Sequence, residues 1–256
     1  MRRVLSGART AVTFSRRGLH GDVVESLGRR VVQGELAPGE VIDVESLERE
    51  FAVSRSVVRE AIRALAAKGL VDARPKYGTF VRERSNWSLL DSDVMAWRAD
   101  GTQNPRLLID LEEVRRIVEP DAARLAALRR EPHDLAVMER ALEQLAHASE
   151  RGAGVGDYAE PDVAFHSAIL VATRNEILLQ LTPVLEHALR MRDSLVYGQL
   201  GELDHAATTA AHQAVLEAIA ARDPDAAEES IRSLLASATS DLERLFETRK
   251  GGAGRR

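Results

Sequence analysis

Two short apolar patterns near the front of the chain predict two helices joined by a tight turn. In the first, Val44, Leu47 and Phe51 recur at helical spacing and form one apolar stripe. Asp43 and Ser54 precede the two patterns and are suitable N-cap residues. This arrangement is typical of a helix-turn-helix.

The second of these helices combines an apolar stripe with a basic one. Val58, Ile62 and Leu65 share its inward face, whereas arginines recur every fourth residue on another face. These arginines are Arg55, Arg59 and Arg63. Such a helix suits the major groove of DNA, because a guanidinium group can bond guanine O6 and N7 together. The alternative is an ordinary solvated face, since arginines at this spacing are common on helix surfaces.

The flanking patterns extend this unit. Residues 21–35 carry apolar side chains at helical spacing and stop at Gly34. Residues 70–81 contain two short strand-like runs around a Pro/Gly turn, which predict a β-hairpin with Arg74 and Lys76 at its tip. Three helices followed by a basic hairpin predict a winged helix-turn-helix, whose wing contacts phosphate or the minor groove.

Behind the hairpin the pattern is helical throughout. Residues 86–100 predict a linker helix whose apolar side chains pack on one side, namely Trp87, Leu90, Val94 and Trp97. Further helices are expected at 105–130, 132–150, 158–172, 176–197, 205–222 and 224–246. Pro120 predicts a kink or break in the first of these, near Val118–Glu119. Short connections between Ala- and Leu-rich helices predict an antiparallel bundle.

The predicted fold class is therefore mainly α, with an N-terminal winged helix-turn-helix and a C-terminal α-helical bundle. The expected parts are a flexible basic arm (1–17), the winged helix-turn-helix DNA-binding domain (18–84), the linker helix (85–104), the all-α domain (105–247) and a disordered tail (248–256).

Composition and charge narrow the class of protein. The 256 residues include no cysteine, which excludes disulfides and thiolate sites. No run of 18 apolar residues is present and the basic start has no secretory apolar stretch, so a cytoplasmic protein without a membrane span is expected. Residues 1–84 carry a net charge of +5 and residues 85–256 carry −10. A basic front part fits a polyanionic partner such as DNA.

The order of several motifs makes a family resemblance specific. The front part resembles the DNA-binding domain of GntR-family transcription regulators in the runs GLHGDVVESLGRRVVQGELAPGE, FAVSRSVVREAIRALAAKGLV and RPKYGTFV. The rear part resembles the effector domain of the FadR-type branch, and within it the repressors of galactonate and related sugar-acid operons. The runs that carry this second resemblance are NWSLLDSDVMAWRAD, EVRRIVEP and LLASATSDL.

The resemblance implies roles for residues of the winged helix. Arg55 and Arg59 match the recognition-helix arginines, and Gly78 lies in the wing turn. The candidate DNA contacts are Arg55, Ser56, Arg59, Arg63, Arg74, Lys76 and Gly78. Family members often carry an arginine where this chain has Glu45, so its operator preference is expected to differ.

In the bundle, a carboxylate and two histidines are candidate metal ligands. Asp162 and His166 are spaced i, i+4 and project from one helix face, while His212 follows on a later helix. Such a set suits Zn²⁺, Ni²⁺ or Mn²⁺. The resemblance implies a fourth ligand, a histidine, where this chain has Leu234, so weakened affinity is expected unless water or the effector completes the shell. The alternative is a buried polar cluster in which Asp162 and His166 satisfy each other.

Arg115 is the candidate anchor for a carboxylate effector, because an arginine inside a bundle needs an anion. The alternative is a salt bridge to Glu112, Glu119 or Asp162. Thr208 and Tyr197 are candidate hydroxyl donors to a polyol, whereas Arg116 is expected to be solvated.

These features predict a homodimeric repressor that binds a palindromic DNA operator and is released by a small carboxylate such as a sugar acid. The alternative is that the protein activates transcription when the effector binds. A regulator of a longer acyl chain would need an apolar tunnel in place of the polar cluster. A metal-dependent enzyme is the rival class, since two histidines and a carboxylate also suit catalysis, but an appended winged helix would then have no purpose.

Overall fold

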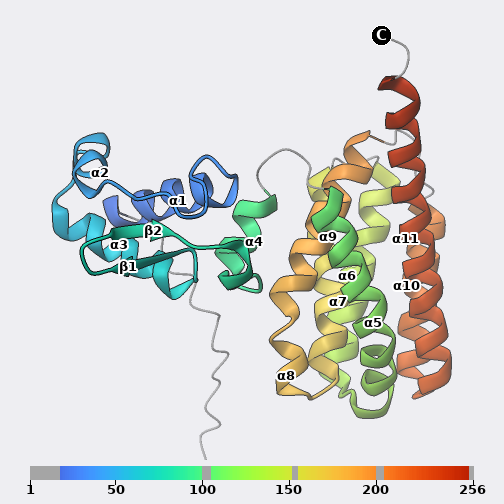
Figure 1. Cartoon of the computed structure of the whole chain (residues 1–256). Coiled ribbons are helices and arrows are strands. Elements are labelled where there is room, and N and C mark those ends of the chain that lie inside the picture. The colour runs from blue at the N-terminus through green and yellow to red at the C-terminus, as the bar shows by residue number, and fades with distance from the viewer. Residues whose placement is uncertain (1–17, 100–104, 152–154, 200–204, 254–256) are drawn as a thin grey trace, which may run out of the picture. The chain divides into compact units, whose positions relative to one another are not determined.

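A computed structural model describes residues 18–99, 105–151, 155–199 and 205–253 of the protein (Figure 1). The chain divides into two compact units, Met1–Arg98 and Ala99–Arg256, called the first and second unit below. Within the described residues the chain is mostly helical with one small two-stranded sheet, which confirms the predicted fold class. No helix in these ranges is long and apolar enough to cross a membrane. The predicted arm at 1–17 lies outside the described residues.

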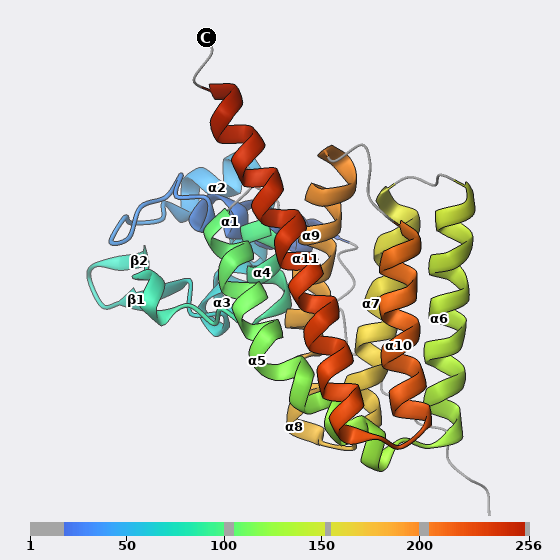
Figure 2. The ribbon, with the colours of Figure 1, turned by 90° about the vertical axis from the view of Figure 1, so that its right-hand side faces the viewer.

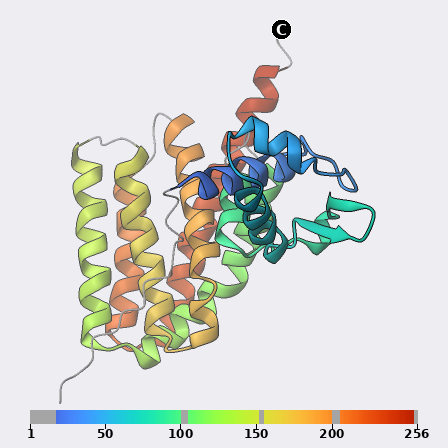
Figure 3. The ribbon, with the colours of Figure 1, turned by 90° about the vertical axis from the view of Figure 1, so that its left-hand side faces the viewer.

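The first unit contains three helices, a hairpin and a further helix. Its elements are α1 (Leu19–Val32), α2 (Val44–Glu50), α3 (Arg55–Ala67), β1 (Val71–Arg74), β2 (Gly78–Val81), a 3-10 turn (Arg84–Asn86) and α4 (Ser92–Ala99). The strands pair antiparallel, with Val71 opposite Val81 and Arg74 opposite Gly78. The hairpin extends from the helices as a wing (Figures 1 and 3).

The apolar stripes predicted from the sequence form the core of this unit. Val58 and Leu65 are fully buried and Ile62 is partly buried against them. Asp43 caps α2 as expected, because its side chain accepts a hydrogen bond of 3.0 Å from the backbone N–H of Glu45. Helix propensity and burial therefore agree along the helix-turn-helix, and the expected cap forms at α2.

The predicted linker helix begins later than expected, at Ser92. Asp91 fixes this start, since its Oδ1 accepts the backbone N–H groups of Asp93 and Val94 at 3.0 and 3.2 Å. Trp87 therefore precedes the helix, and Leu90 is 65% exposed instead of packing with the other apolar side chains. Val94 and Trp97, by contrast, join the core of the first unit, Trp97 so closely that its ring lies over Gly28 of α1.

The second unit is a bundle of long helices that run side by side (Figures 2 and 3). Its elements are α5 (Pro105–Arg129), α6 (Pro132–Arg151), α7 (Val155–Ala172), α8 (Glu176–Leu179), α9 (Thr182–Gln199), α10 (His205–Ala220) and α11 (Pro224–Ala253). Helix α5 packs against α7, α9, α10 and α11, and α7 also packs against α6 and α9. The apolar core between them includes Ala122, Ala126, Phe165, Leu185 and Ile219.

The bundle differs from the expected elements in three places. Helix α5 passes through Pro120 without the break that was one of the two expectations there, since a proline removes one backbone hydrogen bond while the burial of flanking residues such as Ala122 holds the helix. A kink near Val118–Glu119 stays a prediction. The helix expected at 176–197 is divided, because Asn175 caps the short α8 and Pro183 disfavours helical continuation from the residues before it. Helix α11 continues to Ala253, beyond the end expected at residue 246.

Candidate functional site

The exposed face of α3 presents the three predicted arginines. Arg55 is 61% exposed and lies 3.9 Å from Glu48, and Arg63 pairs with Glu60 on the same helix. Arg59 is exposed and forms no ion pair within the described residues. Exposed arginine side chains of this kind can turn toward a phosphate or a base edge of DNA.

The wing places its basic residues as the sequence predicted. The Arg74 guanidinium lies 4.7 Å from the centre of the Phe80 ring, and Lys76 is exposed at the tip. Gly78 has φ +95°, a left-handed conformation that side chains rarely adopt, which explains a glycine in this turn. At the N-terminus of α3 the expected side-chain cap is absent, since the Ser54 hydroxyl bonds the Ser56 hydroxyl at 2.8 Å instead.

The second unit encloses a cluster of charged and polar side chains contributed by four helices. Its members are Glu112, Arg115 and Glu119 of α5, Asp162 and His166 of α7, Arg192 and Asp193 of α9, and His212 of α10, all buried. Long-range packing therefore brings together residues up to about a hundred positions apart in the sequence.

Asp162, His166 and His212 lie close enough for one atom from each to ligate a single ion. Asp162 Oδ1 is 2.9 Å from His212 Nε2 and 3.8 Å from His166 Nε2. The other ring nitrogens face acceptors. His212 Nδ1 is 2.8 Å from the Thr208 carbonyl, and His166 Nδ1 is 2.7 Å from Glu119 Oε2, at ion-pair distance although outside hydrogen-bond geometry. Both Nε2 atoms are thereby directed at the Asp162 carboxylate.

Arg115 is fully buried and is held by two acids of its own helix. Its Nε donates to Glu119 at 2.6 Å and its Nη1 donates to Glu112 at 3.2 Å, the salt bridges that the sequence left open. Burial disfavours the charges of this set, but their mutual attraction outweighs it. The carboxylates of Glu119 and Glu112 raise the pKa of Arg115 above its ordinary value. The positive charges of Arg115 and His166 lower the pKa of the Glu119 carboxyl to about 2.

Arg192 and Asp193 complete the cluster and were missed in the sequence. Arg192 donates from Nη2 to Asp162 at 3.1 Å and from Nε to Asp193 at 2.8 Å. Despite burial, Arg192 holds the pKa of Asp162 well below its usual range. Burial raises the pKa of Asp193 to about 6, an effect that Arg192 opposes and Asp162 reinforces. The available signal was an Arg-Asp pair between the apolar positions Leu189 and Leu195 of one helix.

Several buried polar atoms of this cluster have no hydrogen-bond partner within the described residues. They include Glu112 Oε2, Arg115 Nη2, His166 Nε2 and Asp193 Oδ2, whereas Glu119 Oε2 and His166 Nδ1 have only the ion pair described above. Buried polar atoms are nearly always paired, so such a group of atoms in one place indicates a site that a ligand, an ion or water completes. With both imidazoles neutral, the four carboxylates and two guanidinium groups also leave a formal charge of −2.

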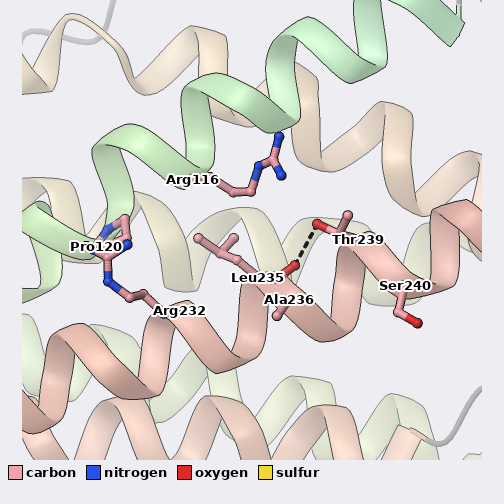
Figure 4. Close-up of a pocket in the computed structure, with 7 residues that line it drawn as sticks. All are labelled: Arg116, Pro120, Arg232, Leu235, Ala236, Thr239 and Ser240. Atoms are coloured by element: carbon pink, nitrogen blue, oxygen red, sulfur yellow. Dashed lines mark hydrogen bonds between the residues drawn. The ribbon is translucent and has the colours of Figure 1, made fainter.

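The remaining candidate residues are Leu234, Thr208, Tyr197 and Arg116. Leu234 is buried in the apolar core of α11 and offers no ligand atom. Thr208 is half-buried and orients His212 through its carbonyl. Tyr197 belongs to α9, but its side chain lies outside the described residues. Arg116 is exposed, as expected, and lines a groove between α5 and α11 (Figure 4).

Comparison with known proteins agrees with both units. Residues 19–81 match the gntR family of bacterial regulatory proteins and residues 110–237 match the FCD domain. The chain is 36% identical over 226 residues to the galactonate operon transcriptional repressor of Escherichia coli K12, covering 87% of this chain and 96% of that protein. It is 31% identical over 160 residues to the Glc operon transcriptional activator of the same strain, covering 61% of each.

A solved structure shares the fold. The regulator Lar, which controls the expression of the Listeria monocytogenes agr system, matches with a TM-score of 0.60 and 22% identity over 90% of this chain and 98% of that one. These relatives are transcriptional regulators, so the enzyme alternative is set aside. The chain belongs to the GntR family of DNA-binding transcriptional regulators and carries an FCD domain behind its winged helix-turn-helix.

Proposed function

We propose that this protein is a homodimeric, cytoplasmic repressor that is released from a palindromic operator when a small carboxylate, a sugar acid of the galactonate class, binds its second unit. Arg55 and Arg59 contact bases of each half-site, with Ser56 and Arg63 beside them. Arg74 and Lys76 hold phosphates, and Gly78 shapes the wing turn. The buried cluster with its unpaired polar atoms carries the effector part of the proposal. The relationship to the galactonate operon repressor supports the class of ligand.

The geometry of Asp162, His166 and His212 fits a divalent metal. A carbonyl oxygen only accepts, so His212 Nδ1 carries the ring proton, and the ionised Glu119 has the same effect on His166. Both Nε2 lone pairs then face a carboxylate oxygen, and three acceptors directed at one point repel each other unless a cation lies between them. Protonated imidazoles are the alternative source of that cation.

The distances also suit such an ion. Ligand atoms about 2.1 Å from a tetrahedral Zn²⁺ lie about 3.4 Å from each other, and the two Nε2–Oδ1 distances of 2.9 and 3.8 Å bracket this value. Zn²⁺, Ni²⁺ or Mn²⁺ would supply two positive charges and so neutralise the formal charge of −2 of the cluster. The ion would also offer a coordination position to an oxygen of the effector. Leu234 leaves that position free of a protein ligand.

Arg115 and Asp193 favour a hydroxylated acid over a simple one. Arg115 Nη2 is a buried donor without a partner and suits the effector carboxylate, whereas Asp193 Oδ2 is a buried acceptor that suits a ligand hydroxyl. Thr208 and Tyr197 are further candidate hydroxyl contacts from α10 and α9. A long acyl chain would meet charged groups on several sides, which makes it the less suitable ligand.

Release of DNA requires that the effector bind one arrangement of the protein better than another. We propose that the ligand relieves repression and does not activate transcription. Because a related protein is named as an activator, membership of the family does not by itself decide between repression and activation.

The test measures ligand binding and operator release together. A thermal-shift screen of aldonates, uronates and 2-hydroxy acids, with and without EDTA, should give a large stabilisation for a polyhydroxy acid that EDTA removes. The same compound should lower the fluorescence anisotropy of labelled promoter DNA, and Arg115→Gln should lose both responses. A protein that retards no promoter fragment at low salt, or whose DNA binding no acid alters, would contradict the proposal.

A further inference from the structure

Glu48 of α2 places an acid beside the first arginine of α3. Its Oε1 lies 3.9 Å from Arg55 Nε, at ion-pair distance, and its side chain is 26% exposed. Glu48 Oε1 is itself buried and has no hydrogen-bond partner within the described residues. Buried carboxylate oxygens are nearly always paired. This oxygen is therefore available to a donor that turns toward it.

The turn between α2 and α3 brings the two side chains together, and the two helices pack against each other (Figure 1). Ala52 has φ +50°, a left-handed conformation that is uncommon outside glycine. The Val53 N–H donates to the Glu48 carbonyl at 3.1 Å, the bond that closes a helix in a Schellman motif. Helix α3 then begins at Arg55. The backbone of Glu48 thus fixes the turn, and its side chain meets the first residue of α3.

Acids beside a DNA-binding helix lower its affinity for every DNA sequence, because phosphates repel them. Residues 43–65 contain five acids and four arginines, a net charge of −1. Glu50 of the same helix is directed elsewhere, since it pairs with Arg30 of α1 at 3.2 Å. Glu48 differs because its neighbour is Arg55, the arginine proposed to contact bases.

We propose that Glu48 is a positioning residue for base recognition, whose carboxylate accepts from Arg55 Nε and orients the guanidinium toward one guanine. The inference rests on the proposed contact of Arg55 with a base of the half-site. A guanidinium that donates from Nε to a carboxylate still presents both Nη groups, which suit guanine O6 and N7. Orienting this group before DNA binds reduces the loss of side-chain freedom on binding. Glu48 therefore raises the preference for guanine while it lowers affinity for DNA in general.

A purely structural role for Glu48 predicts different behaviour. Helix α3 begins with an arginine and has no acid in its first turn, an arrangement that the helix dipole disfavours. An acid near this helix end would offset that effect. Removing it would then lower the stability of the first unit and leave the choice of base unchanged. Base preference is therefore the measurement that separates positioning from stabilisation.

The first test measures base preference with the full-length protein. Selection from a randomised duplex library yields a binding site, and Arg55→Ala and Arg59→Ala identify the base pair that each arginine reads. Fluorescence anisotropy at one salt concentration then compares the selected duplex with duplexes changed at either base pair. A bidentate arginine contact gives about 5- to 150-fold discrimination. Glu48→Ala should lower discrimination at least about threefold at the Arg55 position and leave the Arg59 position unchanged.

Two further measurements separate this effect from a change of charge. Glu48→Ala should bind a duplex of unrelated sequence up to about twofold more tightly, because one acid near the phosphates is removed. Glu48→Gln keeps the size of the side chain and should give an intermediate loss of discrimination, since a neutral oxygen accepts a weaker bond. The matched control, Glu50→Gln, removes an acid from the same helix and should leave base preference unchanged at both positions.

A double-mutant cycle connects the effect to the guanidinium group. In an Arg55→Lys background, Glu48→Ala should change base preference by less than about twofold, because an ammonium group has no planar fork to orient. An effect as large as in the Arg55 background would overturn the positioning role.

The remaining outcomes separate this role from the wider function. Tighter binding to all duplexes with unchanged preference shows that Glu48 only repels phosphates, and equal losses at every position show a structural role. Either result overturns the positioning role while the regulator and its effector stand. A selected site that Arg55→Ala leaves unchanged overturns the proposed base contact of Arg55, and the positioning role with it.

Discussion

Asp193 offers a test of the buried cluster in which removing a charge should stabilise the protein. Its carboxyl pKa rises from 3.8 to about 6 through burial. When a group binds its proton more tightly in the folded state, the free energy of unfolding of the protein falls as the pH rises from the unfolded pKa through the folded pKa. At about 1.4 kcal/mol for each tenfold change, the ionised carboxylate destabilises the fold by about 3 kcal/mol above pH 7.

Asp193→Asn removes that penalty while keeping an oxygen that accepts from Arg192. The hydrogen bond from Arg192 to a neutral amide is weaker than the bond to a carboxylate, which costs about 1 kcal/mol of stability. The net increase in the free energy of unfolding expected at pH 8 in EDTA is therefore about 2 kcal/mol. At pH 4 the gain should vanish to within about 1 kcal/mol, because the folded carboxyl is then protonated and the unfolded carboxyl is close to its midpoint at 3.8, so that the penalty is itself below about 1 kcal/mol. The cost should appear in function, as weaker binding of a hydroxylated effector.

Urea unfolding followed by two probes isolates the effect. Both tryptophans, Trp87 and Trp97, belong to the first unit, so their fluorescence reports that unit while circular dichroism is dominated by the helical second unit. Asp193→Asn should shift only the circular dichroism transition. Glu139→Gln, which neutralises an exposed acid on α6, should shift neither. Equal destabilisation by Asp193→Asn at both pH values would show that the carboxylate is favourably paired when ionised, and would refute the reasoning.

Three further predictions use the same two probes or a binding assay. Arg115→Gln leaves two acids buried without their cation and should cost the second unit about 3–5 kcal/mol by circular dichroism, whereas Arg140→Gln on the exposed face of α6 should be neutral. Gly28→Ala would place a Cβ atom 2.4 Å from the Trp97 ring, and should destabilise the first unit by about 1–3 kcal/mol in tryptophan fluorescence. Leu234→His should raise affinity for Zn²⁺ or Ni²⁺ by at least about tenfold in chelator competition; unchanged affinity would remove that position from the metal site.

Local signals explain which elements were predictable from the sequence. Helices α1 to α3 and the hairpin follow from apolar spacing, caps and a Pro/Gly turn, all within a few residues of each other. The start of α4 was missed because Asp91 serves both as its cap and as a partner of Lys68, at 2.8 Å across the unit. The passage of α5 through Pro120 depends on core packing that only the folded bundle provides.

The candidate site divides in the same way. Asp162 and His166 share a helix at i, i+4 and could be paired by spacing, and His212 was added as a histidine on a later helix of the same bundle. The family resemblance added only the expected fourth ligand, at the position of Leu234. Arg192 meets Asp162 only because α9 packs on α7, and no pattern within either helix announces that contact. Buried charges are generally found through their partners, and those partners are distant in sequence.

The cluster lies where four helices meet, and this location links its charge to the packing of the whole bundle. Arg115 of α5, Asp162 of α7, Arg192 of α9 and His212 of α10 are connected by short polar contacts without an apolar layer between them. A buried charge costs far more when unpaired than an exposed one, so filling the site changes the free energy of all four helix contacts at once. A surface pocket touching one helix could not bias the bundle in this way. An effector needs such a differential free energy between two arrangements to act on DNA at a distance, and a charge deficit at the centre of the bundle is a physical source for it.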